Sequence, residues 1–365
     1  MKVLLCSPYE DTGGIARWTK NILDFFQKDY SNIEIKLFYP SKKIKFQNLK
    51  NKKFNRLLTG IFRYGPFISQ LKKIIRADNY DLAHFSSSGS ISFLRDYLSL
   101  RLCKAYNIKT VFHLHFGRLP QVLKGKSLEK FLFLKCLKYC DKVIAIDLKT
   151  YHALKNINVK NLSYLPNPIS KQLTAIIERN KNIKPQENLL VYVGHIIPSK
   201  GITELIQASS NLNRIQIELL GTIDEDYKNE LFKIIKDKSN INLVFRGQCD
   251  YEEVVRSMMR SSIFVLPSHT EGFPNVILEA MACGCAILST EVGAIPEMLN
   301  ADEGSNNECG ITIPPQDANL LQYKISELLS DKVKSDNLRK NAYERVRKRY
   351  NINYIAQELI SIWES

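Results

Sequence analysis

Two glutamates stand eight residues apart in the stretch EGFPNVILEAMACGCAIL, residues 271–288. Glu271 comes before a Gly-Phe-Pro turn, and Glu279 lies about one turn inside the helix that the apolar pattern NVILEAMAC predicts. The N–H groups at the start of such a helix attract an anion, most commonly a phosphate. Two carboxylates beside a phosphate would repel it unless each binds a neutral, hydroxyl-rich part of the same ligand. The spacing therefore predicts a ligand with a sugar on Glu271, a diphosphate, and a ribose diol on Glu279.

The elements around the two glutamates follow the order strand, loop, helix. The run IFVLPS predicts a buried strand, HTEGFP the loop at its carboxyl end, and NVILEAMAC the helix, with Gly284 as its stop. The same alternation runs along the whole chain, from KVLLCS and IEIKLFYP to LLVYVGHI, QIELLG and AILST. It predicts an α/β fold of two tandem, doubly wound parallel sheets. Ligands of such sheets bind beyond the carboxyl ends of the strands, so we expect the site in a cleft between two domains.

The chain of 365 residues is long enough for two domains. A stretch rich in proline and polar residues, PNPISKQLTAIIERNKNIKPQENL, interrupts the alternation before it restarts at LLVYVGHI. We therefore predict an N-terminal domain over residues 1–166, a linker over 167–186 and a C-terminal domain over 187–350.

The positive charge is concentrated in the first half of the chain. Residues 1–166 hold 30 Lys and Arg against 11 Asp and Glu, a net +19, whereas the remainder holds 22 against 26, a net −4. The basic segment, residues 36–76, contains no acidic residue and carries apolar residues at helical spacing, which are Phe54, Leu57, Leu58, Ile61, Phe67, Leu71, Ile74 and Ile75. This pattern is typical of a solvated lysine-rich helix face or of a helix that docks on anionic lipid. Nucleic acid is not an expected partner, because no recognised nucleic-acid module accompanies the charge.

Cysteine usage and hydropathy indicate the compartment. None of the eight cysteines has the C-x-x-C spacing of a zinc site, so we expect reduced structural thiols. No apolar run approaches the ~20 residues that cross a bilayer, and the apolar run in MKVLLCSPYE is too short for a secretory signal. We expect a cytoplasmic protein, which is peripheral on the inner membrane leaflet if the basic segment binds lipid.

Several motifs together resemble the family 4 retaining glycosyltransferases of the GT-B fold. EGFPNVILEAMACGCAILST looks like the family signature with its two glutamates, and YVGHIIPSKGITELIQA resembles the strand, loop and helix that carry a phosphate-binding lysine. SPYEDTGGIARWTKNI resembles the N-terminal glycine loop, and YLPNPI, EVGAIPEML and CGITIPPQD match further landmarks. In the resembling fold the final helix, here residues 351–365, crosses back onto the N-terminal domain.

The resemblance implies a metal-independent transfer of a sugar from a nucleotide diphosphate donor, with retention of configuration. It implies catalytic roles for Lys200 at the phosphates, Glu271 at the donor sugar, and His115 in FHLHFG at that sugar. His113, two residues earlier, is the alternative if the register differs. The positions that match the family's other donor contacts are Gly13, Gly14, Gly272, Phe273, Pro274, Asn275 and Glu279.

One position departs from the family pattern. Where the family has an arginine in G-R-x-x-x-x-K-G, this chain has His195. An imidazole is mostly neutral near pH 7, so the phosphate loses a bidentate cation. Either another base compensates, or donor binding is weaker and depends on pH.

The residues leave the exact activity open. We expect a UDP-hexose or UDP-N-acetylhexosamine donor, because UDP is the commonest donor base in the resembling family, and a lipid-linked or surface-polysaccharide glycan as acceptor. The alternatives are a sugar-nucleotide epimerase on the same fold and a non-catalytic nucleotide-sugar-binding protein. A dinucleotide-dependent dehydrogenase is disfavoured because TGGIAR lacks the G-x-G-x-x-G spacing.

Overall fold

The structure is a computed structural model that describes the chain except residues 11–12, 31, 40–51, 237 and 301–306. The backbone alone is described for residues 28–29 and 52–63. The chain divides into two compact units. The N-terminal unit comprises Met1–Asn167 and Ile355–Ser365, and the C-terminal unit comprises Pro168–Tyr354.

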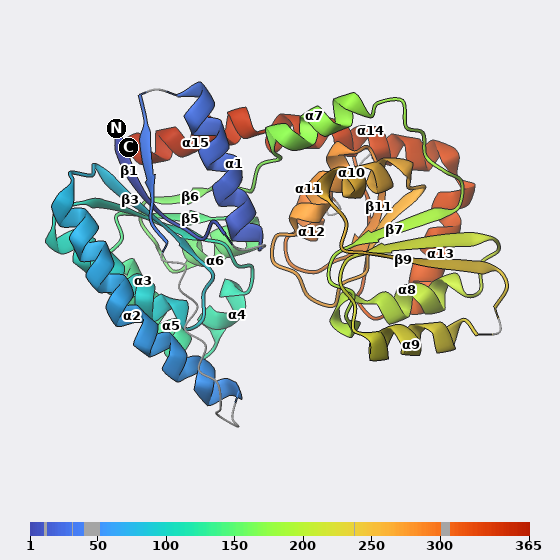
Figure 1. The fold of residues 1–365 in the computed structure, drawn as a ribbon, viewed down its shortest axis with the longest axis horizontal. Helices are drawn as coiled ribbons and strands as arrows, with labels where there is room; N and C mark the ends of the chain where they lie inside the picture. Colours follow the sequence, from blue (N-terminus) through green and yellow to red (C-terminus); the bar gives the residue numbers. More distant parts are fainter. Residues whose placement is uncertain (11–12, 31, 40–51, 237, 301–306) are drawn as a thin grey trace. The chain divides into compact units, whose positions relative to one another are not determined.

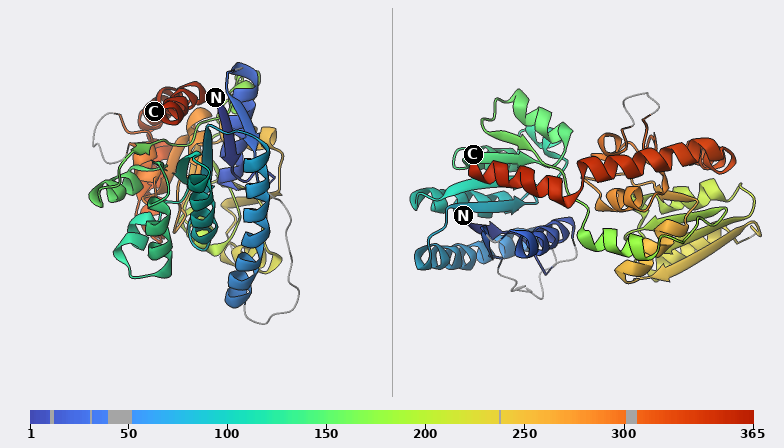
Figure 2. Two further views of the ribbon diagram at one scale, coloured as in Figure 1. Left: turned by 90° about the vertical axis from the view of Figure 1, so that its left-hand side faces the viewer. Right: turned by 90° about the horizontal axis from the view of Figure 1, so that it is seen from above.

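The N-terminal unit contains a six-stranded parallel sheet in the order β2-β1-β3-β4-β5-β6 (Figure 1). Its strands are β1 (Lys2–Cys6), β2 (Glu34–Leu37), β3 (Leu82–Ser87), β4 (Lys109–Leu114), β5 (Lys142–Ala145) and β6 (Leu162–Tyr164). Its helices are α1 (Gly14–Asp29), α2 (Lys52–Ala77), α3 (Ser92–Ala105), α4 (Leu119–Lys124), α5 (Leu128–Leu137), α6 (Leu148–Asn156) and α15 (Ile352–Glu364), which joins this unit from Ile355 onward. Both views of Figure 2 show α15, in red, beside this sheet.

The two faces of the N-terminal sheet differ in character. One face packs against α2, α3 and α5 in an apolar cluster that includes Leu71, Phe93 and Phe133. The opposite face lies under α1 and α15 and carries buried polar rings, among them His84 and His113. Because side chains alternate along a strand, neighbouring residues of β3 and β4 supply the two faces.

The C-terminal unit repeats the architecture with the sheet order β12-β11-β10-β7-β8-β9, again all parallel. Its strands are β7 (Leu189–Val193), β8 (Ile215–Leu220), β9 (Ile241–Gly247), β10 (Ile263–Leu266), β11 (Ala286–Thr290) and β12 (Ile311–Ile313). Its helices are α7 (Lys171–Arg179), the 3-10 turn η1 (Pro198–Lys200), α8 (Ile202–Ser209), α9 (Glu225–Ile234), α10 (Tyr251–Arg260), α11 (Asn275–Ala282), α12 (Ile295–Leu299), α13 (Ala318–Ser330) and α14 (Lys332–Arg349). The prediction of an α/β fold with two parallel sheets is confirmed.

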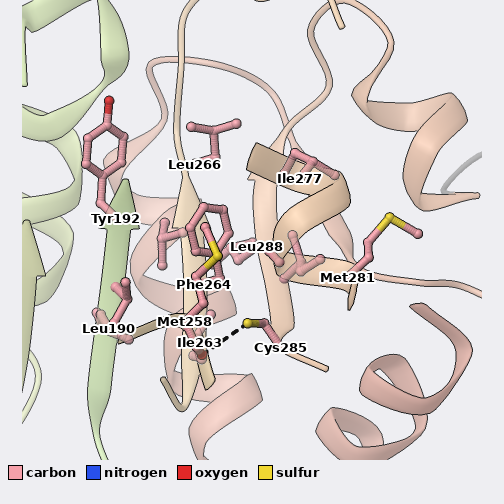
Figure 3. Close-up of a cluster of buried hydrophobic side chains, with 14 of the residues drawn as sticks. Leu190, Tyr192, Met258, Ile263, Phe264, Leu266, Ile277, Met281, Cys285 and Leu288 are labelled. Atoms are coloured by element: carbon pink, nitrogen blue, oxygen red, sulfur yellow. Dashed lines mark hydrogen bonds between the residues drawn. The ribbon is translucent and has the colours of Figure 1, made fainter. Parts of the chain in front are cut away.

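The core beneath α11 is built from apolar side chains of the central strands and the helices that cover them. Figure 3 shows Leu190, Phe264 and Leu288, from the adjacent strands β7, β10 and β11, together with Ile277 and Met281 of α11. All five side chains are fully buried. Parallel sheets covered on both faces need such near-continuous apolar strands, which is why LLVYV and IFVL were recognisable from sequence.

Two segments differ from the sequence interpretation. Residues 167–186, predicted as a linker, contain α7, and its Leu173 and Ile176 are buried in the core of the C-terminal unit. An amphipathic nine-residue helix buries its apolar side against its neighbours, here α10 and α11, and the proline and polar residues at its ends made it resemble a linker.

In the basic segment, α2 contains Phe67, Leu71, Ile74 and Ile75, and these side chains pack in or against the N-terminal core. The side chains of Phe54, Leu57, Leu58 and Ile61 lie outside the described residues. The apolar side chains described on this helix therefore stabilise the N-terminal core. No helix among the described residues is both long and apolar enough to span a bilayer.

Candidate active site

Lys200 and Glu271 follow the two central strands of the C-terminal sheet, β7 and β10, between which the order of the strands reverses. The chain runs outward from β7 to β8 and β9, then returns to β10 on the other side of β7. Ligands of open α/β sheets bind beyond the carboxyl ends of the strands at such a switch point. Lys200 ends the turn η1 after β7, and Glu271 lies in the loop after β10. The fold thus delivers both predicted residues to one edge of one sheet.

The two side chains form an ion pair. The Lys200 Nζ lies 2.6 Å from the Glu271 Oε1, and the Ser268 hydroxyl donates to the same oxygen at 2.7 Å. The side chains are 26% and 13% exposed, so the pair is partly open to solvent. An ammonium has three N–H donors and a carboxylate two oxygens, so both groups retain capacity to bind a ligand. The sequence predicted separate duties for Lys200 and Glu271, and the structure brings them into contact.

Gly201 allows the two loops to approach each other. Its φ is +71°, and a Cβ at this position would lie 2.0 Å from the carbonyl oxygen of Pro267. No L side chain fits that space, and the positive φ favours glycine independently. The backbone N–H of His269 also donates to the Ser199 carbonyl at 3.0 Å. Close backbone contact therefore fixes the distance between the lysine loop and the glutamate loop.

A second glycine supports the backbone of Glu271 from the other side. Gly293 has φ +58°, and a Cβ there would lie 2.5 Å from the carbonyl oxygens of both Glu271 and Gly272. The N–H of Ala294 donates to the Gly272 carbonyl at 2.8 Å. Gly201 and Gly293 are not among the site residues predicted from the sequence, although both lie inside motifs that carry the family resemblance.

Glu279 occupies a buried position in α11. The residue is 6% exposed, and its Oε1 accepts a hydrogen bond from the Tyr251 hydroxyl at 3.2 Å. Tyr251 begins α10 and was not anticipated, because nothing in the local sequence connects it with a glutamate in the next helix.

The residues between the two glutamates start α11. Pro274 is the N-cap and Asn275 the first helical residue, while Phe273 packs against the core and lies 6.3 Å from the Tyr350 ring. Proline has no side-chain acceptor, so Pro274 does not cap the first N–H groups of the helix. A helix start of this kind suits an anionic ligand.

His195 lies in the loop after β7, at the same edge of the sheet as Lys200. Its side chain is exposed, and its Nδ1 is 2.9 Å from the Thr222 hydroxyl. The Tyr192 hydroxyl donates to the His195 carbonyl at 2.9 Å, which anchors the backbone.

In the N-terminal unit, Gly13 is the N-cap of α1, the helix that follows β1. Its φ is −77°, a value open to any residue, and no described atom lies within 4 Å of where a Cβ would be. Neither backbone conformation nor packing requires glycine at this position. Gly14 is the first residue of the helix and is also exposed.

His115 follows β4 and lies in a cluster of aromatic and imidazole rings. Its ring centroid is 3.8 Å from that of His113 and 5.0 Å from that of Trp18, and its backbone N–H donates to the Ser87 carbonyl. Burial lowers the pKa of His115 to about 3, so the imidazole is neutral at pH 7. Neither ring nitrogen has a partner among the described residues. His113, by contrast, lies within the strand and is fully buried.

A directed chain of hydrogen bonds supports the ring cluster. The indole Nε1–H of Trp363 donates to His84 Nδ1 at 3.0 Å, and His84 Nε2 lies 3.3 Å from His113 Nδ1. Because an indole nitrogen only donates, His84 must accept at Nδ1 and carry its proton on Nε2. His113 then accepts at Nδ1. Helix α15 therefore sets the tautomers of two histidines on neighbouring strands.

The described residues contain no group of three or more His, Cys, Asp or Glu side chains arranged to hold a metal ion. All eight cysteines are free thiols. The metal-independent chemistry implied by the resemblance remains an expectation.

Comparison with known proteins identifies relatives over nearly the whole chain. The family described as Glycosyltransferase Family 4 matches residues 12–173, and the family described as Glycosyl transferases group 1 matches residues 174–345. An uncharacterized glycosyltransferase of Methanocaldococcus jannaschii is 27% identical over 357 residues, which cover 94% of this chain and 93% of that protein.

Two further matches are informative. The N,N'-diacetylbacillosaminyl-diphospho-undecaprenol alpha-1,3-N-acetylgalactosaminyltransferase of Campylobacter jejuni is 26% identical over 212 residues, 58% of this chain and 53% of that protein. The structure of Anabaena HepE in complex with UDP and glucose matches with a TM-score of 0.69 at 16% identity, covering 100% of both chains. At that identity the structural match demonstrates the fold.

Proposed function

The chain belongs to the family 4-type glycosyltransferases of the GT-B fold, and from that premise we propose its donor, its mechanism and its acceptor class. The donor is a UDP-hexose or UDP-N-acetylhexosamine, and the sugar passes to an acceptor hydroxyl with retention of configuration and without a bound metal. The observation that carries this proposal is the contact between Lys200 and Glu271 at the switch point of the C-terminal sheet.

A leaving diphosphate needs its developing charge stabilised by preorganised positive groups. Lys200 supplies an ammonium, and the start of α11 supplies backbone N–H groups aligned with the helix dipole. Glu271 holds the ammonium in place through the 2.6 Å contact and offers its second oxygen to a sugar hydroxyl. One ion pair therefore fixes the relative positions of Lys200, which binds the phosphates, and Glu271, which binds the sugar.

Glu279 is assigned to the ribose diol, with Tyr251 as its support. The tyrosine hydroxyl donates to Oε1 and so helps to orient the carboxylate. Gly272, Phe273, Pro274 and Asn275 shape the loop between the two carboxylates.

For the N-terminal unit we assign Gly13, Gly14 and His115 to the donor, as the family resemblance implies. The open space at Gly13 is consistent with backbone reserved for a ligand. A neutral imidazole both donates and accepts a hydrogen bond, so His115 suits a sugar hydroxyl better than a phosphate. His195 is assigned to the phosphates. Donor affinity that is flat between about pH 5.5 and about pH 8 would argue against a charged His195.

The proposed chemistry is a front-face displacement in which the donor phosphate helps to deprotonate the acceptor. The Campylobacter relative carries an undecaprenol diphosphate acceptor in its name, which supports a lipid-linked or surface-polysaccharide glycan as acceptor here. An acceptor of that kind would be met at the inner leaflet of the membrane by a cytoplasmic enzyme.

The test is a panel of nucleotide sugars incubated with the purified protein, with nucleotide release and the configuration of the sugar products followed by proton NMR, which distinguishes anomers and epimers. Released UDP with free or transferred sugar of the donor's anomeric configuration supports the proposal. Interconversion of nucleotide sugars would replace it with an epimerase, and tight binding without turnover would replace it with a binding protein. Glu271→Gln should lower release roughly 10²–10³-fold, and Glu225→Gln, in an exposed Lys228–Glu225 pair, should leave it unchanged.

A further inference from the structure

Helix α5 exposes apolar side chains on the side that does not face the core. Leu128 is 67% exposed, Phe131 55% and Leu134 39%. The three positions are spaced by three residues, so they form one ridge along the helix. Phe133 and Cys136, on the opposite side, are fully buried in the N-terminal core. Figure 1 shows α5 among the helices on that face of the sheet.

This helix is apolar all round, with seven apolar residues among the ten of LEKFLFLKCL. A surface helix normally carries one apolar stripe and a polar opposite face, and a helix apolar on both sides is normally covered on both. Half of the exposed large apolar side chains described in the N-terminal unit lie on α5, the others being Tyr9, Leu148 and Ile157. A contiguous apolar ridge of this kind marks an interaction surface.

Lysines surround the ridge. Lys124, Lys126 and Lys138 are exposed, and the Lys135 ammonium lies 5.2 Å from the Phe131 ring centroid. Lys135 and Lys138 fall on the same side of the helix as the ridge, because they follow Phe131 by four and seven residues.

The surrounding segment has little negative charge to offset the lysines. Residues 117–140 hold six basic residues and a single acidic one, Glu129. That carboxylate is neutralised by a bidentate pair with Arg118 and also accepts from the Ser90 N–H. The field at the ridge is therefore positive.

We propose that the ridge of Leu128, Phe131 and Leu134, with Lys124, Lys126, Lys135 and Lys138 around it, docks the protein on an anionic lipid bilayer. The apolar side chains enter the boundary between head groups and acyl chains, and the ammonium groups remain among the anionic head groups. This inference does not depend on which sugar is transferred.

Charge and composition favour lipid over a protein partner. Protein interfaces are depleted in lysine and enriched in tyrosine, tryptophan and arginine, whereas interfacial helices combine lysine with leucine and phenylalanine. The surface also differs from the basic segment, residues 36–76, in which the described apolar side chains of α2 pack against the core. Among the described residues, the geometry therefore points to α5 as the docking surface.

The direct test is a Phe131→Trp reporter. The two native tryptophans, Trp18 and Trp363, are only 1% and 2% exposed, so wild-type protein provides the background emission. Vesicles contain phosphatidylcholine with about one third phosphatidylglycerol, or phosphatidylcholine alone. We expect a blue shift and quenching by brominated acyl chains with the anionic vesicles at low salt, and a marked loss of both at high salt.

The matched test uses flotation with the same vesicles. Changing Leu128, Phe131 and Leu134 to serine should lower the fraction bound about tenfold or more. Val333→Ser is the control, because Val333 is 73% exposed between Lys332 and Lys334 in the C-terminal unit. We expect weaker binding to anionic vesicles, with a smaller salt dependence, when Lys124, Lys126 and Lys138 are changed to glutamine. The same change at Lys332, Lys340 and Lys348 should leave vesicle binding unaltered.

Several outcomes would overturn the proposal. These are no binding of wild-type protein to anionic vesicles at low salt, equal binding of the ridge variant, or a lipid-independent blue shift that grows with protein concentration, which would mean that a second copy covers the ridge. Transfer to a water-soluble acceptor separates this inference from the proposed activity. The ridge variant should keep wild-type kcat/KM in that assay, and a protein that binds vesicles but transfers nothing would refute only the activity.

Discussion

The two units carry their predicted site residues in opposite electrostatic environments. In the C-terminal unit, Lys200 and Glu271 form a charged pair that is partly open to solvent. In the N-terminal unit, His84 and His115 are held neutral by burial, each with its pKa lowered to about 3. The N-terminal unit, with a net charge of +17, thus surrounds its predicted site residue with uncharged rings, and the C-terminal unit, with a net charge of −2, presents an ammonium. Net charge of a domain says little about the charge at its site.

The difference has a physical consequence for stability and function. A charged pair at the sheet edge meets a charged ligand with groups that are already ionised and oriented. A buried neutral imidazole cluster provides hydrogen bonding without charge, but it makes the folded state sensitive to acid. Acidification should therefore destabilise the N-terminal unit more than the C-terminal unit. Mutation of the ion pair should lower catalytic activity more than it lowers the free energy of unfolding.

The largest expected effect is acid destabilisation of the N-terminal unit. Between the ordinary pKa of 6.5 and the folded value of about 3, the unfolded chain binds protons at His84 and His115 that the folded chain does not. Stability is therefore complete above pH 6.5 and falls as pH decreases, by roughly 2 kcal/mol for each imidazole between about pH 6.5 and about pH 5.

Tryptophan fluorescence can follow this unit alone, because Trp18 and Trp363 both belong to it. Urea unfolding at a series of pH values gives the free energy of unfolding of the N-terminal unit. Hydrogen exchange gives the stability of the C-terminal unit at the same pH values for comparison. An unfolding midpoint that does not change between about pH 7 and about pH 5 would contradict the assignment of buried neutral imidazoles.

The next effect concerns catalysis in the C-terminal unit. Glu271→Gln or Lys200→Met should each lower kcat/KM roughly 10²–10³-fold, because each removes a charged group proposed to act on the donor. The double variant should lose much less than the product of the single losses, since the two side chains are in contact. Urea unfolding should change little. Independent, multiplicative losses would show that the ion pair is not a functional unit.

A smaller effect compares the two buried tryptophans. Trp363→Phe removes the N–H that His84 Nδ1 accepts, leaving a buried acceptor unpaired, which costs about 1–3 kcal/mol beyond lost packing. Trp18→Phe is the matched control, since its Nε1 has no partner among the described residues. Thermal unfolding should rank wild type, Trp18→Phe and Trp363→Phe in decreasing stability. The reverse order would refute the directed hydrogen-bond chain.

The smallest expected effect is at Tyr251. Tyr251→Phe removes the hydrogen bond to Glu279 Oε1 and should weaken donor binding by about 1 kcal/mol, roughly fivefold in Kd, with kcat nearly unchanged. Isothermal titration with UDP measures this directly. A change in kcat with unaltered UDP affinity would contradict the assignment of Glu279 to the ribose diol and would indicate a role for it in the chemical step.

Much of the site was accessible from sequence because its spacing is local. Lys200 ends a turn after one strand, and Glu271 and Glu279 are separated by one loop and one helical turn, so each motif predicts its own geometry. The supporting residues were not accessible. Tyr251 lies in a different helix from Glu279, and Trp363 is 279 residues from His84. Helix α7 was missed for a related reason, because its apolar side is recognisable only from its packing against α10 and α11, which are distant in sequence.

Local periodicity and short motifs were enough to establish the α/β class, the two sheets and the family, because backbone conformation and strand burial depend on neighbouring residues. The tertiary structure decided which distant segments meet. It brought the loops after β7 and β10 together so that Lys200 contacts Glu271, and it placed α15 against the histidines of β3 and β4. It also determined which side of α5 stays exposed. Hydrogen bonds and burial are properties of three-dimensional proximity, and no spacing along the chain encodes them.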